Sequence, residues 1–131
     1  MKTLVLAVLF AAFAPLLAMA QEPGEDPLAE YLWVARPAII FADSPLDPRL
    51  VQQLAAFEER RAELDERDVV VIVDTERSSP LRTALRPRDF QFVLIGKEGQ
   101  VIYRRPEPVT VREIIRLIDR TPLRQQEIGR S

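Results

Sequence analysis

Four carboxylates follow two apolar stretches of this sequence, and they are the side chains with the clearest potential for chemistry. Asp43 and Asp47 come after the first stretch, and Asp74 and Glu76 come at the end of the second. If the two stretches are neighbouring parallel strands, these groups share one edge of the sheet, where ligands of open α/β sheets gather. Carboxylate oxygens suit a hard cation such as calcium, and a carboxylate pair can act as acid and base. The four residues are therefore a candidate metal or acid–base site.

The same carboxylates also have local structural explanations. Asp47 stands before Pro48 and the first apolar residue of a predicted helix, which is the pattern of an N-cap followed by proline at the first helical position. Asp43 suits a turn, and Asp74 suits the end of a strand. The spacing does not match a dedicated calcium-binding loop. We favour the local explanation and keep the metal site as the alternative.

Cysteine and histidine are both absent from the 131-residue chain. Their absence excludes thiol redox chemistry, cysteine nucleophiles, Ser-His-Asp triads and ordinary zinc sites. We therefore expect no catalytic residues, no cofactor and no enzymatic activity, and a carboxylate-dependent enzyme is the alternative. The formal net charge of −2 gives no electrostatic basis for binding nucleic acid.

The first twenty residues have the pattern of a secretory signal peptide. Lys2 gives a positive start, residues 3–17 are almost wholly apolar, and Ala18 and Ala20 are the small residues that precede a cleavage site. The apolar run is shorter than the roughly 20 residues of a membrane-spanning helix. We expect cleavage after Ala20, export, most simply to the periplasm, and no membrane span afterwards. An uncleaved N-terminal anchor is the alternative.

The remaining pattern predicts one α/β domain at residues 31–121, between a flexible polar leader at 21–30 and a polar C-terminal tail at 122–131. Strands are expected at 37–42, 69–74, 90–95 and 100–104, and helices at 47–66, 79–86 and 110–121. The run VVVIVD at 69–74 is typical of a central parallel strand that is buried on both faces. Thr110 and Glu113 have the spacing of a capping box.

The order strand, helix, strand, short helix, hairpin, helix predicts a thioredoxin-like fold. This is a mixed four-stranded sheet with two parallel crossovers, then an antiparallel hairpin, and helices on both faces. In thioredoxin-like proteins the turn after the first strand, here within AIIFADSPLDPRL at 38–50, carries the reactive cysteine pair. Redox-active members also have a cis-proline before the third strand, whereas the nearest proline here, Pro87, lies several residues early.

Four stretches of the chain carry a family resemblance: YLWVARPAIIFADSPLDPRL, RDVVVIVD, FQFVLIGKEGQVIYR and TPLRQQE. Over residues 30–127 they resemble a family of bacterial exported domains of unknown function, related to a domain in animal sushi-repeat-containing extracellular proteins. The resemblance implies a thioredoxin-like fold and an exported location. It implies no catalytic residues.

An intact fold pattern without its cysteines predicts a non-catalytic domain that binds a protein or peptide of the cell envelope. The expected binding residues are Asp43, Ser44 and Asp47 in the turn, Phe90 before the third strand, and Tyr31 and Trp33 near the start of the domain. We expect Trp33 to dock the leader onto the domain, with an exposed, partner-binding aromatic as the alternative.

Overall fold

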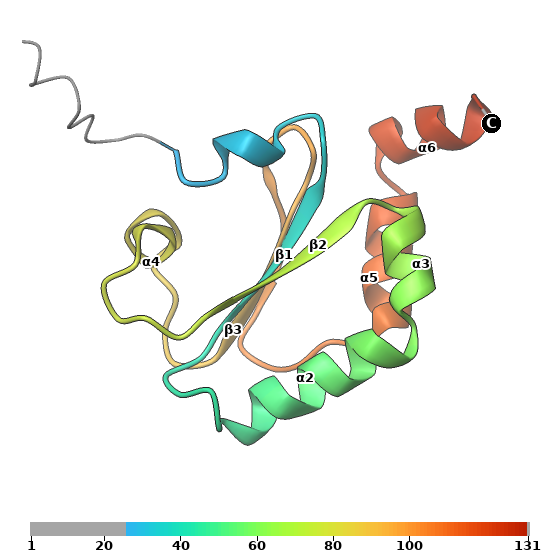
Figure 1. Ribbon diagram of the computed structural model, residues 1–131. Coiled ribbons are helices and arrows are strands. Elements are labelled where there is room, and N and C mark those ends of the chain that lie inside the picture. Colours follow the sequence, from blue (N-terminus) through green and yellow to red (C-terminus); the bar gives the residue numbers. More distant parts are fainter. Residues whose placement is uncertain (1–25, 131) are drawn as a thin grey trace, which may run out of the picture.

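The computed structural model describes residues 26–130, so the predicted signal peptide and the first half of the leader lie outside the described residues (Figure 1). Within the described part no helix is both long and apolar enough to cross a membrane. The elements are η1 (Ala29–Tyr31), β1 (Arg36–Phe41), α2 (Pro48–Glu59), α3 (Arg61–Glu66), β2 (Val69–Asp74), α4 (Pro80–Leu85), β3 (Gln91–Ile95), β4 (Val101–Arg105), α5 (Val111–Asp119) and α6 (Pro122–Gly129).

The four strands form one mixed sheet in the order β2-β1-β3-β4. Strand β1 is parallel to β2 and antiparallel to β3, and β4 is antiparallel to β3. Helices α2, α3 and α5 cover one face, and α4 and η1 lie on the other (Figure 1). The predicted thioredoxin-like α/β class, with a mixed four-stranded sheet and helices on both faces, is confirmed.

One detail of the predicted topology is wrong, because the sheet contains a single parallel crossover instead of two. The connection from β2 to β3 contains only the six-residue helix α4. The chain enters β3 from the end of the sheet at which β2 finishes, and β3 runs antiparallel to β1.

Strand β2 has the predicted bounds, but it lies at an edge of the sheet and not at its centre. Its valines are partly covered on both faces, and Val73 remains 43% exposed. A continuous apolar run indicates that both faces of a strand are covered. It does not indicate whether the strand has a neighbouring strand on each side, and for this reason the predicted central position of β2 was wrong.

The predicted helix at 47–66 is divided into α2 and α3 at Arg60, where the backbone leaves the helical region with φ −126° and ψ 36°. Phe57 and Leu64, on either side of the break, are both buried in the same core cluster. The direction change therefore keeps the second half of the segment packed against the sheet.

Helix α6 occupies most of the segment that was expected to be a polar tail. Thr121 caps it by accepting a hydrogen bond from the backbone N–H of Arg124, and Pro122 is the first helical residue. The same cap-and-proline pattern begins α2 at Asp47 and α4 at Ser79. We interpreted Pro122 only as the residue that ends the helix before it, whereas it is also the first residue of α6.

Candidate functional site

The turn after β1, residues 43–48, satisfies its own polar groups. Asp47 caps α2 as predicted, accepting from the backbone N–H of Arg49 at 2.9 Å. The Arg49 guanidinium also binds the Asp47 carboxylate at 2.8 Å and Asp89 at 3.2 Å. The hydrogen bond from the Arg49 side chain is the main reason why the pKa of Asp47 is lowered. The predicted cap is confirmed, and the Asp47 carboxylate and the Arg49 guanidinium are already paired with each other.

Two other predicted binding residues of this region also have structural partners. The Ser44 hydroxyl accepts from the backbone N–H of Leu46 at 3.0 Å. Phe90 is 1% exposed and lies beneath the Arg49 guanidinium, 5.1 Å from the ring centre, so its ring cannot face a partner directly. Leu46, 83% exposed, stands at an open depression of about 430 Å³ over the turn.

Arg82 from α4 fills the space between the carboxyl ends of β1 and β2. One of its terminal nitrogens donates to the carbonyl oxygens of Ala42 at 2.7 Å and Asp74 at 3.2 Å. The guanidinium also pairs with the carboxylates of Asp74 at 3.5 Å and Asp43 at 3.9 Å. Asp74 is buried, and it accepts further hydrogen bonds from the Ser79 hydroxyl and from the backbone N–H of Glu76. An internal arginine thus supplies the positive charge that a metal ion would otherwise provide.

The four predicted metal ligands are not assembled into one site. Asp43 and Asp74 meet at Arg82, whereas Asp47 faces Arg49 and Glu76 is exposed. Across residues 26–130 no group of three or more potential metal-binding side chains is placed to hold an ion. The shared edge was predicted correctly, and the alternative of a metal site is not supported because the four carboxylates do not converge.

Tyr31 and Trp33 lie at the opposite end of β1 from the turn, so the predicted binding residues do not form one surface (Figure 1). Trp33 is 65% exposed, and its neighbours Leu32 and Val34 are also exposed. We call these three residues the exposed apolar segment. For residues 26–30, the described part of the leader, the prediction that Trp33 docks it is wrong, because Leu28 and Tyr31 instead line the small cavity of about 120 Å³ beneath the segment.

The backbone of the exposed apolar segment is held in an uncommon conformation. Trp33 has a φ of +63°, in the left-handed region that favours glycine. Its N–H donates to the carbonyl oxygen of Lys97 at 2.7 Å, and this bond ties the segment to the turn between β3 and β4. The bond holds the segment in place without burying the indole ring.

An ion network lies below this attachment point. The Lys97 ammonium binds Asp68 at 2.8 Å and Glu127 of α6 at 2.9 Å. Glu127 also pairs with Arg36 and Arg124, each at 3.3 Å, and the Arg36 side chain is only 1% exposed. We call Arg36, Lys97, Arg124 and Glu127 the basal ion network. Sequence reasoning missed it, because no local pattern marks an arginine that pairs with a residue 91 positions later.

Burial and charge oppose each other in this network. Burial alone would raise the pKa of Glu127, but the hydrogen bond from Lys97 and the charges of Arg36 and Lys97 hold it below its usual value. Burial alone would lower the pKa of Lys97, yet hydrogen bonds to Asp68 and Glu127 raise it. Glu127 and Lys97 are therefore both charged near neutral pH, and their ion pair is maintained.

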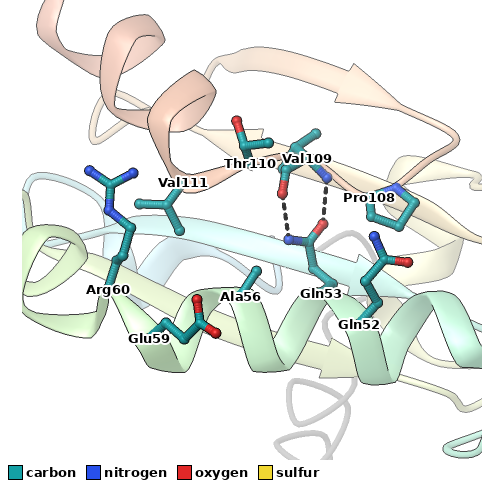
Figure 2. A pocket seen from close by; sticks show the side chains of 9 residues that line it. All are labelled: Gln52, Gln53, Ala56, Glu59, Arg60, Pro108, Val109, Thr110 and Val111. Carbon is teal, nitrogen blue, oxygen red and sulfur yellow. Dashed lines mark hydrogen bonds between the residues drawn. The ribbon is translucent and has the colours of Figure 1, made fainter.

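A second depression, of about 260 Å³, lies between α2 and the segment before α5 (Figure 2). Gln53 at its base is fully buried, donates to the carbonyl oxygen of Val109 and accepts from the Val109 N–H, both at 2.8 Å. The amide thus joins α2 to the α5 connection as a backbone group would. Because both of its ends are used, Gln53 offers no free group to a ligand.

The described residues thus define a thioredoxin-like domain whose usual reactive turn is filled by arginine–carboxylate pairs. The chain belongs to the family described as a domain of unknown function, DUF4174, whose model matches residues 27–127. No curated protein was found that matches the chain.

Several solved structures share the fold at low sequence identity. The reduced 2-Cys peroxiredoxin of Plasmodium vivax has a TM-score of 0.58 at 14% identity, covering 76% of this chain and 83% of that chain. Thioredoxin peroxidase I of Plasmodium yoelii has a TM-score of 0.52 at 19% identity, with coverages of 76% and 79%. The mitochondrial 2-Cys peroxiredoxin of Plasmodium falciparum has 0.53 at 14%, with coverages of 70% and 78%. At these identities the similarity establishes the fold alone.

Proposed function

We propose that this chain is an exported, non-catalytic thioredoxin-like domain that binds a protein or peptide of the cell envelope. The signal-peptide pattern of residues 1–20 supports export. The absence of cysteine and histidine, together with the paired charges around the turn, supports a role without catalysis. The binding surface we assign is the exposed apolar segment at the amino end of β1.

The single observation that carries this proposal is that Trp33 is both strained and exposed. A non-glycine residue in the left-handed region is destabilising by roughly 1–2 kcal/mol, and here the strained residue also leaves a large aromatic side chain 65% exposed. Such strain is concentrated at functional sites, and tryptophan is enriched among the residues that dominate binding energy at interfaces. A partner that covers Leu32, Trp33 and Val34 would bury this surface.

The surroundings of the segment suit it to binding. Trp33 is hydrogen-bonded to the backbone of Lys97, whose side chain is anchored by Asp68 and Glu127. A surface that is already held in its bound conformation loses less conformational entropy on association. The basal ion network therefore serves to position the segment.

The competing proposal, a carboxylate-dependent or metal-dependent enzyme, has less support. It requires free carboxylates at the strand ends, but Asp43 and Asp74 share Arg82, and Asp47 is bound by Arg49. Glu76 is exposed and lies outside these pairs, so only one of the four carboxylates is left and no acid–base pair is formed.

Capture from envelope extract tests the proposal, with and without chemical cross-linking. The baits are the mature protein, Trp33→Ala and the control Leu46→Ala, which truncates an exposed leucine at the opposite end of β1. We expect a partner that the mature protein and Leu46→Ala retain and that Trp33→Ala loses. Recovery of nothing above background in both formats, or equal capture by Trp33→Ala, would overturn the proposal.

A further inference from the structure

The small cavity beneath the exposed apolar segment is built from parts of the chain that are distant in sequence. Its lining includes Leu28 and Tyr31 from the region of η1, Leu85 from the end of α4, and Ile95 and Val101 from β3 and β4. Leu28 and Leu85 also pack against the buried cluster that contains Ile95. The floor of the cavity is therefore part of the hydrophobic core on this face of the sheet.

The lining of this cavity is mainly apolar, unlike that of the depressions over the turn and beside α2. Charged side chains form most of the lining over the turn, and polar side chains form much of the lining beside α2. Among residues 26–130, Asp26 is the one charged residue that lines the small cavity, and its carboxylate accepts a hydrogen bond from the Leu28 N–H at 2.9 Å. An anionic ligand would find no cation in this lining, whereas an apolar group would find apolar contacts.

The size of the cavity limits what can enter it. Pockets for drug-sized ligands have about 300–1,000 Å³, and the volume here is only about 120 Å³. An apolar cavity of about 150 Å³ binds benzene. The cavity therefore suits one branched alkyl group or one aromatic ring, which is the size of a single leucine or phenylalanine side chain.

Glycines in the turn between β3 and β4 contribute to this shape. Gly96 and Gly99 both line the cavity, and Gly99 has a φ of +90°, a conformation that favours glycine. A Cβ atom on Gly99 would lie 3.0 Å from the Leu32 Cδ2 atom. The missing side chain thus lets Leu32 lie against the turn. Leu32 belongs both to the wall of the cavity and to the exposed apolar segment.

The mouth of the cavity is continuous with the binding surface assigned to the partner. Leu32 and Val101 line the cavity and remain 38% and 47% exposed. Trp33 and Val34 follow Leu32 directly, and each is 65% exposed. A partner that covers these residues lies beside the mouth. Residues that dominate binding energy at interfaces typically fill pockets of this kind.

The chain itself is a poor source of the side chain that would enter. Residues 21–25 are Gln, Glu, Pro, Gly and Glu, so this stretch contains no large apolar group. Leu46 is the most exposed large apolar residue among residues 26–130, but it lies at the opposite end of β1. Its insertion into a second copy would be a head-to-tail contact, which forms rings or open filaments. A separate partner protein requires no such assembly.

We propose that the cavity binds one leucine-sized or phenylalanine-sized side chain of the partner that covers the exposed apolar segment. This rests on the proposed function, which it deepens by naming the group that the partner must supply. The side chain enters between Leu32 and Val101 and packs against Leu85 and Ile95.

Benzene tests the cavity as a defined probe, followed by methyl NMR of the mature protein. Pyrazine, a ring of the same size with two polar nitrogens, is the matched probe. We expect benzene to shift the methyl signals of Leu28, Leu32, Leu85, Ile95 and Val101 in a saturable manner. We also expect it to bind about tenfold more tightly than pyrazine. Absence of saturable shifts at these methyls, or equal affinity for the two rings, would overturn the inference.

Two variants on α4 separate binding in the cavity from general stickiness. Ala84 lines the cavity and is exposed, so Ala84→Phe fills the mouth from a position outside the core. It should weaken both benzene binding and capture of the envelope partner about tenfold or more. Thr83→Phe places the same ring at the neighbouring exposed position, which does not line the cavity, and should leave both unchanged. Equal behaviour of the two variants, each with an unchanged Tm, would overturn the inference.

The capture results distinguish this inference from the proposed function. Capture that is lost in Trp33→Ala but kept in Ala84→Phe rejects the role of the cavity and keeps the proposed function. Saturable benzene binding without any captured partner rejects the envelope role and keeps the cavity as a site for an apolar group. Methyl shifts that grow with protein concentration without a probe, and vanish in Leu46→Ala, would show that a second copy fills the cavity and would overturn the inference.

Discussion

The two ends of β1 differ in how completely they satisfy their own groups. At the carboxyl end, Arg49 and Arg82 pair with the neighbouring carboxylates, and Arg82 also donates to the carbonyl oxygens of Ala42 and Asp74. At the amino end, Glu127 pairs with Arg36, Lys97 and Arg124, but the buried Arg124 Nε lacks a hydrogen-bond partner within the described part of the chain, and Trp33 above the network is strained and exposed. The end that carries chemistry in redox-active members of this fold has its charges paired here and exposes the single leucine Leu46, whereas the other end exposes three consecutive apolar residues.

This difference shows that a position that is reactive in some members of a fold need not keep that function in others. A thioredoxin-like turn can keep its strand, cap and helix while arginine side chains take over the place of a reactive group. Function has to be argued from the groups left without internal partners. Among residues 26–130, the exposed large apolar side chains that follow one another in the sequence are those of Leu32, Trp33 and Val34.

The largest expected effect comes from the basal ion network. Glu127→Ala removes the acceptor shared by Arg36, Lys97 and Arg124, and it leaves the nearly inaccessible Arg36 without its carboxylate. Breaking a buried pair is destabilising by about 3–5 kcal/mol. Because 20% of the Glu127 side chain is exposed, we expect a loss of about 2–3 kcal/mol. Urea denaturation measures it, with exposed Gln126→Ala as control, and an equal effect of both would contradict the account.

Removing Arg82 should open the closed end. Arg82→Met keeps the aliphatic stem but removes the cation beside buried Asp74, which retains only its hydrogen bonds from Ser79 and Glu76, and it removes the side-chain donor to the Ala42 carbonyl. We expect a loss of about 2 kcal/mol, whereas Arg86→Met, on an exposed neighbour, should change little. Envelope capture should survive both changes. If Arg82→Met abolished capture while remaining folded, the partner surface would be at the turn.

Acid should destabilise the fold by weakening the ion pairs of Asp119 and Glu127. The folded pKa of Asp119 is lowered chiefly by its hydrogen bond from Arg67, and that of Glu127 is lowered by Lys97 and Arg36. A lowered carboxyl pKa contributes stability above the ordinary values of 3.8 and 4.5, and this stability is lost as pH falls through the folded values.

Denaturation at several pH values should therefore show constant stability from about pH 7 to 5. Below this range, stability should fall by about 1 kcal/mol or more. Glu127→Gln should flatten part of that fall, and a slope that is unchanged in the variant would argue against the network.

The strain at Trp33 predicts a gain in stability when function is removed. Trp33→Gly relieves the left-handed conformation and should stabilise the fold by about 0.5–1 kcal/mol, while abolishing capture. Val34→Gly is the matched control, because Val34 is equally exposed but has no positive φ. It should destabilise the fold. Two changes of the same sign would show that strain at Trp33 is not the cause.

The smallest expected effect is that of divalent cations. Since Arg82 and Arg49 already pair with Asp43, Asp74 and Asp47, three of the four predicted ligands, millimolar calcium or magnesium should leave the Tm unchanged. Differential scanning fluorimetry of the mature protein checks this, with sodium chloride of equal ionic strength as reference. A cation-specific rise in Tm would reinstate the carboxylate site.

Local patterns in the sequence predicted local structure well. The N-caps predicted at Asp47 and Thr110 are confirmed, and Ser79 caps α4 in the same way. The second half of the predicted capping box is not observed, because the Glu113 side chain binds Tyr103 and Arg105. These features depend on residues close in sequence, where spacing is informative.

Features that depend on distant partners were missed. Buried Gln53 mimics a backbone group for Val109, Arg82 reaches back to β1, and Arg36 pairs with α6. The edge position of β2 depends on which strands lie beside it. No property of these residues alone reveals such contacts. The candidate carboxylates could therefore be located in the sequence, but the arginines that pair with them could not.

Site-specific photocross-linking in cells tests the central claim most directly. A photoreactive phenylalanine analogue is placed at position 33 in one strain and at position 46 in another, where Trp33 and Leu46 are exposed at opposite ends of β1. The account predicts a light-dependent adduct from position 33 and none from position 46. An adduct from position 46 alone would contradict it, since the partner would then bind at the closed turn.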